Sequence, residues 1–96
     1  MKILEIIYSL ASGGAERFVV DLSNELSEMN NTVILCTAQD DSKKNFGFYK
    51  NEISPKVIYR NLKLKEGFDV KNVYYFWKLI KELKPDVIHC HLNVVN

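Results

Sequence analysis

The sequence predicts an α/β fold, namely a parallel Rossmann-like sheet with the strand order 3-2-1-4. Short apolar segments rich in β-branched residues alternate with segments whose apolar residues recur every three or four positions. This alternation is typical of a parallel sheet with right-handed helical crossovers. In the usual doubly wound order the first strand is central, with the second and third strands to one side and the fourth to the other.

The first half of the chain contains a strand, a helix and a second strand. Residues 3–8 are nearly all apolar, which is typical of a central strand covered on both faces. Residues 15–29 form a predicted helix whose apolar stripe consists of Ala15, Val19, Leu22, Leu26 and Met29. Asn30 ends this helix, because asparagine tolerates the left-handed conformation common just past a helix, and residues 32–37 form the second strand.

The second half repeats the pattern. Residues 56–62 contain enough β-branched and aromatic side chains for a third strand. A second helix ends at Lys84-Pro85, and its expected apolar stripe consists of Val70, Val73, Trp77, Ile80 and Leu83. Residues 86–92 then form the fourth strand.

Length and charge limit the classes of function. A chain of 96 residues is one small domain or a piece of one, and its formal net charge of +1 gives no general attraction to nucleic acid. No apolar run approaches the roughly 20 residues that span a bilayer, and no signal-peptide cleavage site follows Met1. We therefore expect a cytoplasmic protein without a nucleic-acid partner, which could also lie peripherally on the inner face of a membrane.

The two cysteines, Cys36 and Cys90, lie in apolar segments and are expected to be small buried side chains with free thiols. In the predicted strand order they are two strand spacings apart, roughly 9.6 Å, which is beyond the reach of a disulfide.

The predicted strand order places a ligand site at the carboxyl ends of the first and fourth strands, where the order reverses. Gly13 and Gly14 precede the first helix, where free backbone N–H groups and the helix dipole suit a phosphate, a carboxylate or a sugar hydroxyl. Glu16 lies in the first helical turn. The same residues also fit a tight turn and plain stabilisation of the dipole, and the glycine spacing matches neither the dinucleotide fingerprint nor a Walker loop.

His89 and His91 project from the same face of the predicted fourth strand. His91 lies at its carboxyl end, at the edge of the predicted site, whereas His89 lies deeper and is expected to be a hydrogen-bonded core residue. Two imidazoles are too few ligands for a metal ion, and Cys36 lies on a non-adjacent strand, so we expect no metal site and no bound cofactor.

Three segments together resemble the amino-terminal domain of family 4 glycosyltransferases. They are the first strand, the motif Ser12-Gly13-Gly14-Ala15-Glu16-Arg17 with the helix that continues Val-Val-Asp-Leu-Ser-Asn-Glu-Leu, and Lys-Pro-Asp-Val-Ile-His-Cys-His after the second helix. Their order and spacing agree over essentially the whole chain. The resemblance implies the GT-B fold, in which two Rossmann-like domains flank a cleft. It also implies sugar transfer from a nucleotide-sugar donor to a sugar or lipid-linked acceptor with retention of configuration.

The resemblance further implies that Gly13 and Gly14 approach the donor phosphates or the transferred sugar, and that His91 lines the acceptor side of the cleft. Because configuration is retained, His91 is expected to position the ligand and not to act as an inverting general base, and no catalytic residue is assigned. Members of the family continue into a second, nucleotide-binding domain. Residues 1–96 are therefore expected to be an incomplete, acceptor-side domain that is inactive alone.

Two other classes stay open. One is a fragment of a dinucleotide-dependent enzyme, with Asp40 as the ribose-binding acid, and the other is a non-catalytic α/β binding module. In each case the fourth strand is expected to leave one edge of the sheet unpaired, with the apolar residues Val87, Ile88, Leu92, Val94 and Val95 incompletely covered. We therefore expect the chain alone to self-associate through this strand.

Overall fold

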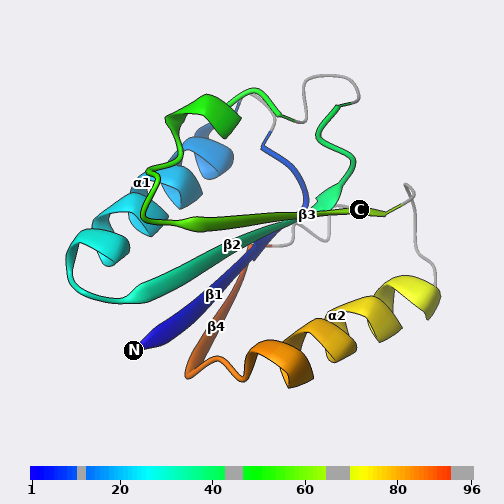
Figure 1. The fold of residues 1–96 in the computed structure, drawn as a ribbon. Coiled ribbons are helices and arrows are strands. Elements are labelled where there is room, and N and C mark those ends of the chain that lie inside the picture. Colours follow the sequence, from blue (N-terminus) through cyan, green and yellow to red (C-terminus); the bar gives the residue numbers. More distant parts are fainter. Residues whose placement is uncertain (11–12, 43–46, 65–69, 92–96) are drawn as a thin grey trace.

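The computed structural model describes residues 1–10, 13–42, 47–64 and 70–91. For residues 70–73 it describes the backbone but not the side chains. One parallel sheet and two α-helices account for most of this chain (Figure 1). The sheet comprises β1 (Lys2–Ile7), β2 (Thr32–Gln39), β3 (Ile58–Leu64) and β4 (Val87–His91), and the helices are α1 (Gly14–Glu28) and α2 (Val70–Leu83). The strand order is β3-β2-β1-β4, so the predicted fold class and order 3-2-1-4 are confirmed.

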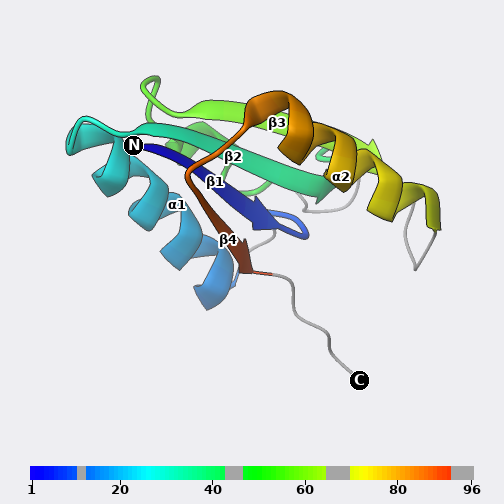
Figure 2. The same ribbon diagram turned by 90° about the horizontal axis from the view of Figure 1, so that it is seen from below.

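The helices cover opposite faces of the sheet (Figure 2). On one face, α1 packs on a core of buried residues that comprises Ile7, Leu10, Val19, Val20, Val33, Leu35 and Val57. On the other face, Leu79 of α2 packs with Leu4, Ile6, Ile34 and Cys36. β1 is covered on both sides, as expected of the central strand. Neither helix of the described residues has the length and apolar character needed to cross a membrane.

Both helices are rotated relative to the stripes that the sequence predicts. The buried side of α1 consists of Val19, Val20, Ser23 and Ser27, whereas Ala15 and Met29 are exposed. On α2 the residue Trp77 is 55% exposed, and its ring lies beside the ammonium group of Lys81, 4.7 Å from Nζ to the ring centroid. The Lys81 ammonium stabilises this exposed ring through a cation–π contact.

The end of α1 follows the sequence prediction. Asn30 has a positive φ of 64°, the left-handed conformation expected just past the helix. The side-chain amide of Asn31 donates a hydrogen bond of 3.0 Å to the carbonyl of Leu26, which satisfies one of the free carbonyl groups of the last turn.

A polar network ties the carboxyl end of β2 to β3 and to the loop that follows β2. The Tyr59 hydroxyl donates to Asp41 Oδ2 at 2.8 Å and lies 2.9 Å from Thr37 Oγ1. Asn61 Nδ2 donates to Thr37 Oγ1 at 2.7 Å, and Lys50 Nζ lies 3.2 Å from Asp41 Oδ2. Burial raises the pKa of Tyr59 above its usual value, so this hydroxyl remains a donor in the folded protein.

β4 forms the edge of the described sheet, with β1 as its neighbour. Ile88 is 39% exposed, and Cys90 is exposed, contrary to the expectation of a buried thiol, because no described helix covers this part of β4. Cys36 is buried as expected. Both thiols are free, and both pair in register with Ile6 from opposite sides, which confirms their separation by two strand spacings.

Candidate functional site

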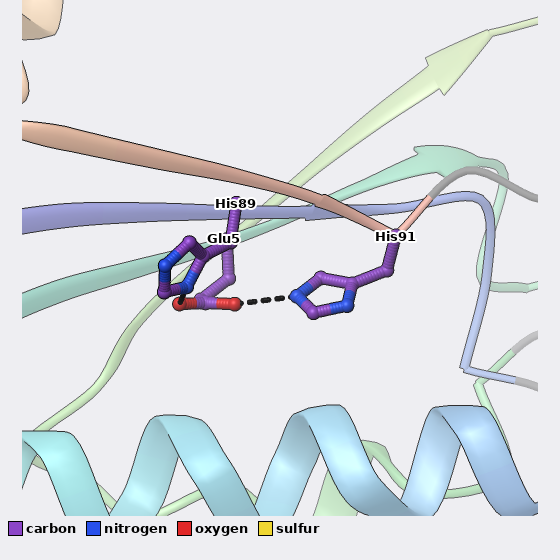
Figure 3. A group of neighbouring side chains, drawn as sticks. All are labelled: Glu5, His89 and His91. Atoms are coloured by element: carbon purple, nitrogen blue, oxygen red, sulfur yellow. Dashed lines mark hydrogen bonds and ion pairs between the residues drawn. The ribbon is translucent and has the colours of Figure 1, made fainter.

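A buried carboxylate lies between the two histidines at the junction of β1 and β4. Glu5 is opposite His89 in the parallel register, and Ile7 is opposite His91, so Glu5 on β1 is flanked by both imidazoles of β4. All three side chains point toward the side of the sheet that α1 covers (Figure 3). The alternating direction of side chains along a strand explains why residues 89 and 91 face Glu5 while Cys90 faces away.

Both oxygens of Glu5 are occupied by imidazole nitrogens. His89 Nδ1 lies 2.7 Å from Oε2, and His91 Nε2 lies 2.7 Å from Oε1. The Glu5 side chain is 0% exposed, and a buried ionised carboxylate is costly unless it is paired or hydrogen-bonded. The two imidazoles supply that compensation from the more open side, since the side chains of His89 and His91 are 45% and 23% exposed.

The carboxylate also determines which imidazole nitrogens carry a proton. An ionised carboxylate can only accept hydrogen bonds, so each imidazole nitrogen that contacts it must donate an N–H. In a neutral imidazole the other nitrogen then carries a lone pair. In this neutral form, His91 Nδ1 and His89 Nε2 are hydrogen-bond acceptors, and both point away from Glu5 (Figure 3).

The glycine pair forms the start of α1. Gly13 is the N-cap residue with extended backbone, and its carbonyl accepts the first helical hydrogen bond from Arg17 N at 3.1 Å. A Cβ atom at residue 13 would lie 3.0 Å from both carboxylate oxygens of Glu16, so that side chain folds back over Gly13. At Gly14 a Cβ atom would meet nothing within 4 Å. The backbone at the amino end of α1 is therefore open at Gly14.

The start of α1 lies at the same end of the sheet as the carboxyl end of β4 (Figure 2). Gly13, Gly14, Glu16 and His91 thus share one edge of the described structure, although no hydrogen bond within the described residues joins His91 to the other three. Ser12 of the same motif lies outside the described residues. His91 is instead joined to Glu5.

One expectation about these histidines was wrong, and one residue of the site was not predicted. His89 is hydrogen-bonded as predicted, but it is exposed and not part of the core, because β4 is an edge strand and α1 contacts β1 and β2. Sequence reasoning also missed Glu5. The available signal was a carboxylate inside an otherwise apolar central strand, since glutamate is almost never fully buried without a partner.

Other charged residues near the start of α1 have structural partners. Arg17 lies 3.4 Å from Asp21 and 3.6 Å from Glu52, and these carboxylates raise the pKa of Arg17. Asp40 Oδ1 accepts hydrogen bonds from the backbone and the hydroxyl of Ser42, which closes a turn. A pocket of about 310 Å³ lies elsewhere, between β3 and α2, where its lining includes Arg60 and Lys78.

Comparison with known proteins gives the family. Neither the curated proteins nor the solved structures contain a significant match to this sequence. The model of Glycosyltransferase Family 4 matches residues 12–95, a range that contains the glycine pair, Glu16 and both histidines, while Glu5 precedes it. With a parallel β3-β2-β1-β4 sheet and a match over nearly all of its length, the chain belongs to glycosyltransferase family 4.

Proposed function

We propose that this chain is the acceptor-side, amino-terminal part of a retaining GT-B glycosyltransferase. In this proposal the enzyme moves a sugar from a nucleotide-sugar donor to a sugar or lipid-linked acceptor. Family membership supports sugar transfer, and the strand order supports a ligand crevice at the carboxyl ends of β1 and β4. The contact between Glu5 and His91 at this edge is the observation that carries the proposal.

His91 is proposed to bind a sugar hydroxyl through Nδ1. Glu5 accepts a hydrogen bond from Nε2–H, so Nδ1 of the neutral imidazole can accept a hydrogen bond from a hydroxyl group. Glu5 also fixes the ring before the sugar arrives, which reduces the ordering that binding requires. A neutral imidazole that accepts a hydrogen bond can position a sugar without taking part in bond cleavage, which agrees with retention of configuration.

Gly13 and Gly14 are proposed to face the donor phosphates or the transferred sugar. The open space at Gly14 leaves the first backbone N–H groups of α1 accessible, and the positive end of the helix dipole favours an anion. Glu16 already occupies the space over Gly13, so we assign contact with a sugar hydroxyl, and not with a phosphate, to this carboxylate.

The 96-residue chain is proposed to be inactive alone. Departure of a nucleoside diphosphate needs cations or dipoles placed around the developing charge. At this edge the described groups are one helix amino terminus, two imidazoles and Arg17, whose charge is paired with Asp21 and Glu52. We therefore propose that the remaining groups come from a donor-binding domain. The proposal includes a cytoplasmic location, with contact at the inner face of a membrane if the acceptor is lipid-linked.

Transfer of labelled sugar from a panel of nucleotide sugars tests this function. The chain alone should give no transfer, whereas a protein that joins it to the donor-binding domain of a family member should be active. Substitution His91→Ala in the joined protein should lower kcat/KM by more than about tenfold. Because the variant also loses a donor to the buried Glu5 and should melt at a lower temperature, both proteins are assayed well below their melting temperatures. Transfer by the chain alone, or equal activity of the variant, would contradict the assignment.

A matched pair of variants tests the role of His91 Nδ1. His91→Asn places an amide where Nδ1 lies but cannot reach Glu5, whereas His91→Gln can reach Glu5 but has no polar atom at the position of Nδ1. If Nδ1 binds the sugar, the asparagine variant should retain more activity than the glutamine variant. The opposite order would mean that the contact with Glu5 is the whole role of His91.

The dinucleotide alternative is separated by thermal shift. Nucleotide sugars should raise the melting temperature of the joined protein, and NAD should not. A shift with NAD alone would favour the dinucleotide-dependent class, and no shift with either would favour a binding module.

We also propose that the chain alone self-associates through β4. Ile88 is exposed on this edge strand, whose outer backbone groups have no described neighbour, although Leu92, Val94 and Val95 lie outside the described residues. Sedimentation at micromolar concentration should show dimers or larger species, and Ile88→Lys should weaken them. A well-folded monomer would contradict this part of the proposal.

A further inference from the structure

Glu5, His89 and His91 bring together three atoms that are able to bind a metal ion. One carboxylate oxygen and one nitrogen from each imidazole all lie within 4.8 Å of one another. Within the part of the chain that the structure describes, no other set of three histidine, cysteine, aspartate or glutamate side chains is so close. The sequence alone suggested two ligands, and the buried Glu5 is the third.

This set of ligands selects the class of metal. Two imidazole nitrogens with one carboxylate oxygen form the protein ligands of many catalytic zinc sites, which keep a fourth position open. Imidazole favours Zn²⁺ and other late transition metals over Mg²⁺ and Ca²⁺, which prefer oxygen ligands. The two imidazole nitrogens lie 2.7 Å from different oxygens of Glu5, and one ligand atom from each of the three residues lies within 4.8 Å of the other two. A tetrahedral Zn²⁺ at ~2.0 Å from each ligand atom would need them roughly 3.3 Å apart. Small rotations of the two partly exposed imidazoles can supply this difference.

The surroundings favour a cation at this point. The parallel pairing of β1 and β4 fixes the three backbone positions, so the ligands are already assembled. Glu5 is fully buried, and a divalent ion would neutralise a carboxylate that otherwise depends on two hydrogen bonds. The half-exposed His89 leaves a path from solvent to the cluster.

We propose that Glu5, His89 and His91 form a binding site for a divalent transition-metal ion, represented by Zn²⁺, with at least one open coordination position. The ion takes the place of the two N–H protons between Glu5 and the imidazoles. Each imidazole then carries its proton on the other nitrogen. His91 Nδ1 thereby changes from a hydrogen-bond acceptor to a donor.

This change gives the site a regulatory consequence, which rests on the proposed function. If a sugar hydroxyl donates to His91 Nδ1, bound Zn²⁺ removes that acceptor and inhibits transfer. Metal binding itself does not depend on this role of His91, so the two ideas can fail separately.

Metal binding is tested first, with the untagged 96-residue chain. Its two histidines are both in the cluster, so any binding that requires imidazole reports on this site. Competition with a chromophoric chelator should give one Zn²⁺ per chain with a Kd below about 10 µM. Bound Co²⁺ should give the visible absorption typical of four- or five-coordinate sites.

His89→Asn is the decisive variant. Its amide can replace Nδ1 as the donor to Glu5 and so preserve the fold, which far-UV circular dichroism checks, but an amide is a poor ligand for Zn²⁺. The affinity should fall more than about tenfold, as it does when metal sites lose supporting groups. Cys90→Ser is the matched control, because this exposed thiol faces the opposite side of β4, and it should leave the affinity unchanged. Absence of stoichiometric binding, or equal affinity in His89→Asn, would overturn the proposal and leave a hydrogen-bonded cluster only.

The regulatory part uses the joined protein, with the metal chelated or supplied. Zn²⁺ at the measured Kd should halve transfer in the parent and leave His89→Asn unaffected at that concentration. If Zn²⁺ binds but transfer does not change, the metal site stands and the proposed role of His91 fails. If the joined protein neither binds Zn²⁺ nor transfers sugar, the metal site and the proposed function are each contradicted by a separate measurement.

Discussion

The energetic link between Glu5 and His89 can be measured with a double-mutant cycle. His89→Ala removes the donor to Glu5 Oε2 and leaves one oxygen of a fully buried carboxylate without its described partner. Glu5→Leu removes the carboxylate itself and leaves an apolar side chain of similar size. The double variant combines both changes, so the cycle isolates the interaction between the two side chains.

The expected cost of His89→Ala follows from the burial of its partner. A hydrogen bond to a charged group contributes about 1.5 to 3 kcal/mol, against a total of about 5 to 15 kcal/mol for a domain. Because His89 is 45% exposed, water can enter the vacated space, and we expect the lower limit, about 1.5 kcal/mol. In the Glu5→Leu background the same substitution should cost less than about 0.5 kcal/mol, because no buried charge remains.

Urea unfolding followed by far-UV circular dichroism gives the four free energies of unfolding. The coupling energy should be at least about 1 kcal/mol, and His89→Ala alone should lower the melting temperature by about 6 to 12 °C. If the two substitutions are additive within about 0.5 kcal/mol, Glu5 does not depend on His89, and the argument from burial is wrong.

Three further predictions concern other parts of the chain. Gly14→Ala should raise the free energy of unfolding by about 0.4 to 1 kcal/mol, because the new Cβ atom meets no other atom and the unfolded chain loses entropy. The same substitution should weaken nucleotide-sugar binding, and unchanged binding in a titration would count against a ligand at Gly14. Tyr59→Phe should lower the free energy of unfolding by about 1 to 2 kcal/mol, since Asp41 loses a donor, and an unchanged urea midpoint would disprove this. Burial raises the pKa of Cys36 from 9.0 to about 12. As the pH rises, the thiol therefore ionises first in the unfolded chain. The free energy of unfolding should be unaffected by this thiol below pH 9 and should fall between about pH 9 and 12, by up to about 1.4 kcal/mol per pH unit. Urea titrations across this range should show a smaller decline in Cys36→Ala, and an equal decline would refute this origin.

The sheet could be predicted from the sequence because its strands are short apolar segments and its crossovers follow a strong rule of handedness. The buried faces of the two helices were harder to predict. In α2 the apolar pattern assigns Trp77 to the core, whereas the structure exposes it beside Lys81. Periodicity gives the width of an apolar face, but the contact with a twisted sheet decides which side of that face is buried.

The candidate site could be predicted only in part from the sequence, for a related reason. His91 could be placed at the carboxyl end of its strand from the pattern alone. Glu5 belongs to a different strand, 84 residues before His89, and its role depends on the parallel register between β1 and β4. A single sequence carries no direct information on which residues of two distant strands lie opposite each other.

The carboxylate between the two imidazoles also specifies how β4 aligns on β1. Because side chains alternate along a strand, a slip of one residue would turn both histidines to the other face, bring Cys90 toward Glu5 and leave a buried carboxylate without imidazole donors. A slip of two residues would remove one of the two imidazoles from its oxygen. Ile88 is exposed and Val87 is only partly buried, so these apolar side chains discriminate weakly between the alignments. The polar cluster therefore fixes the register of β4 on β1. Substitutions at Glu5 are expected to let β4 populate other registers as well.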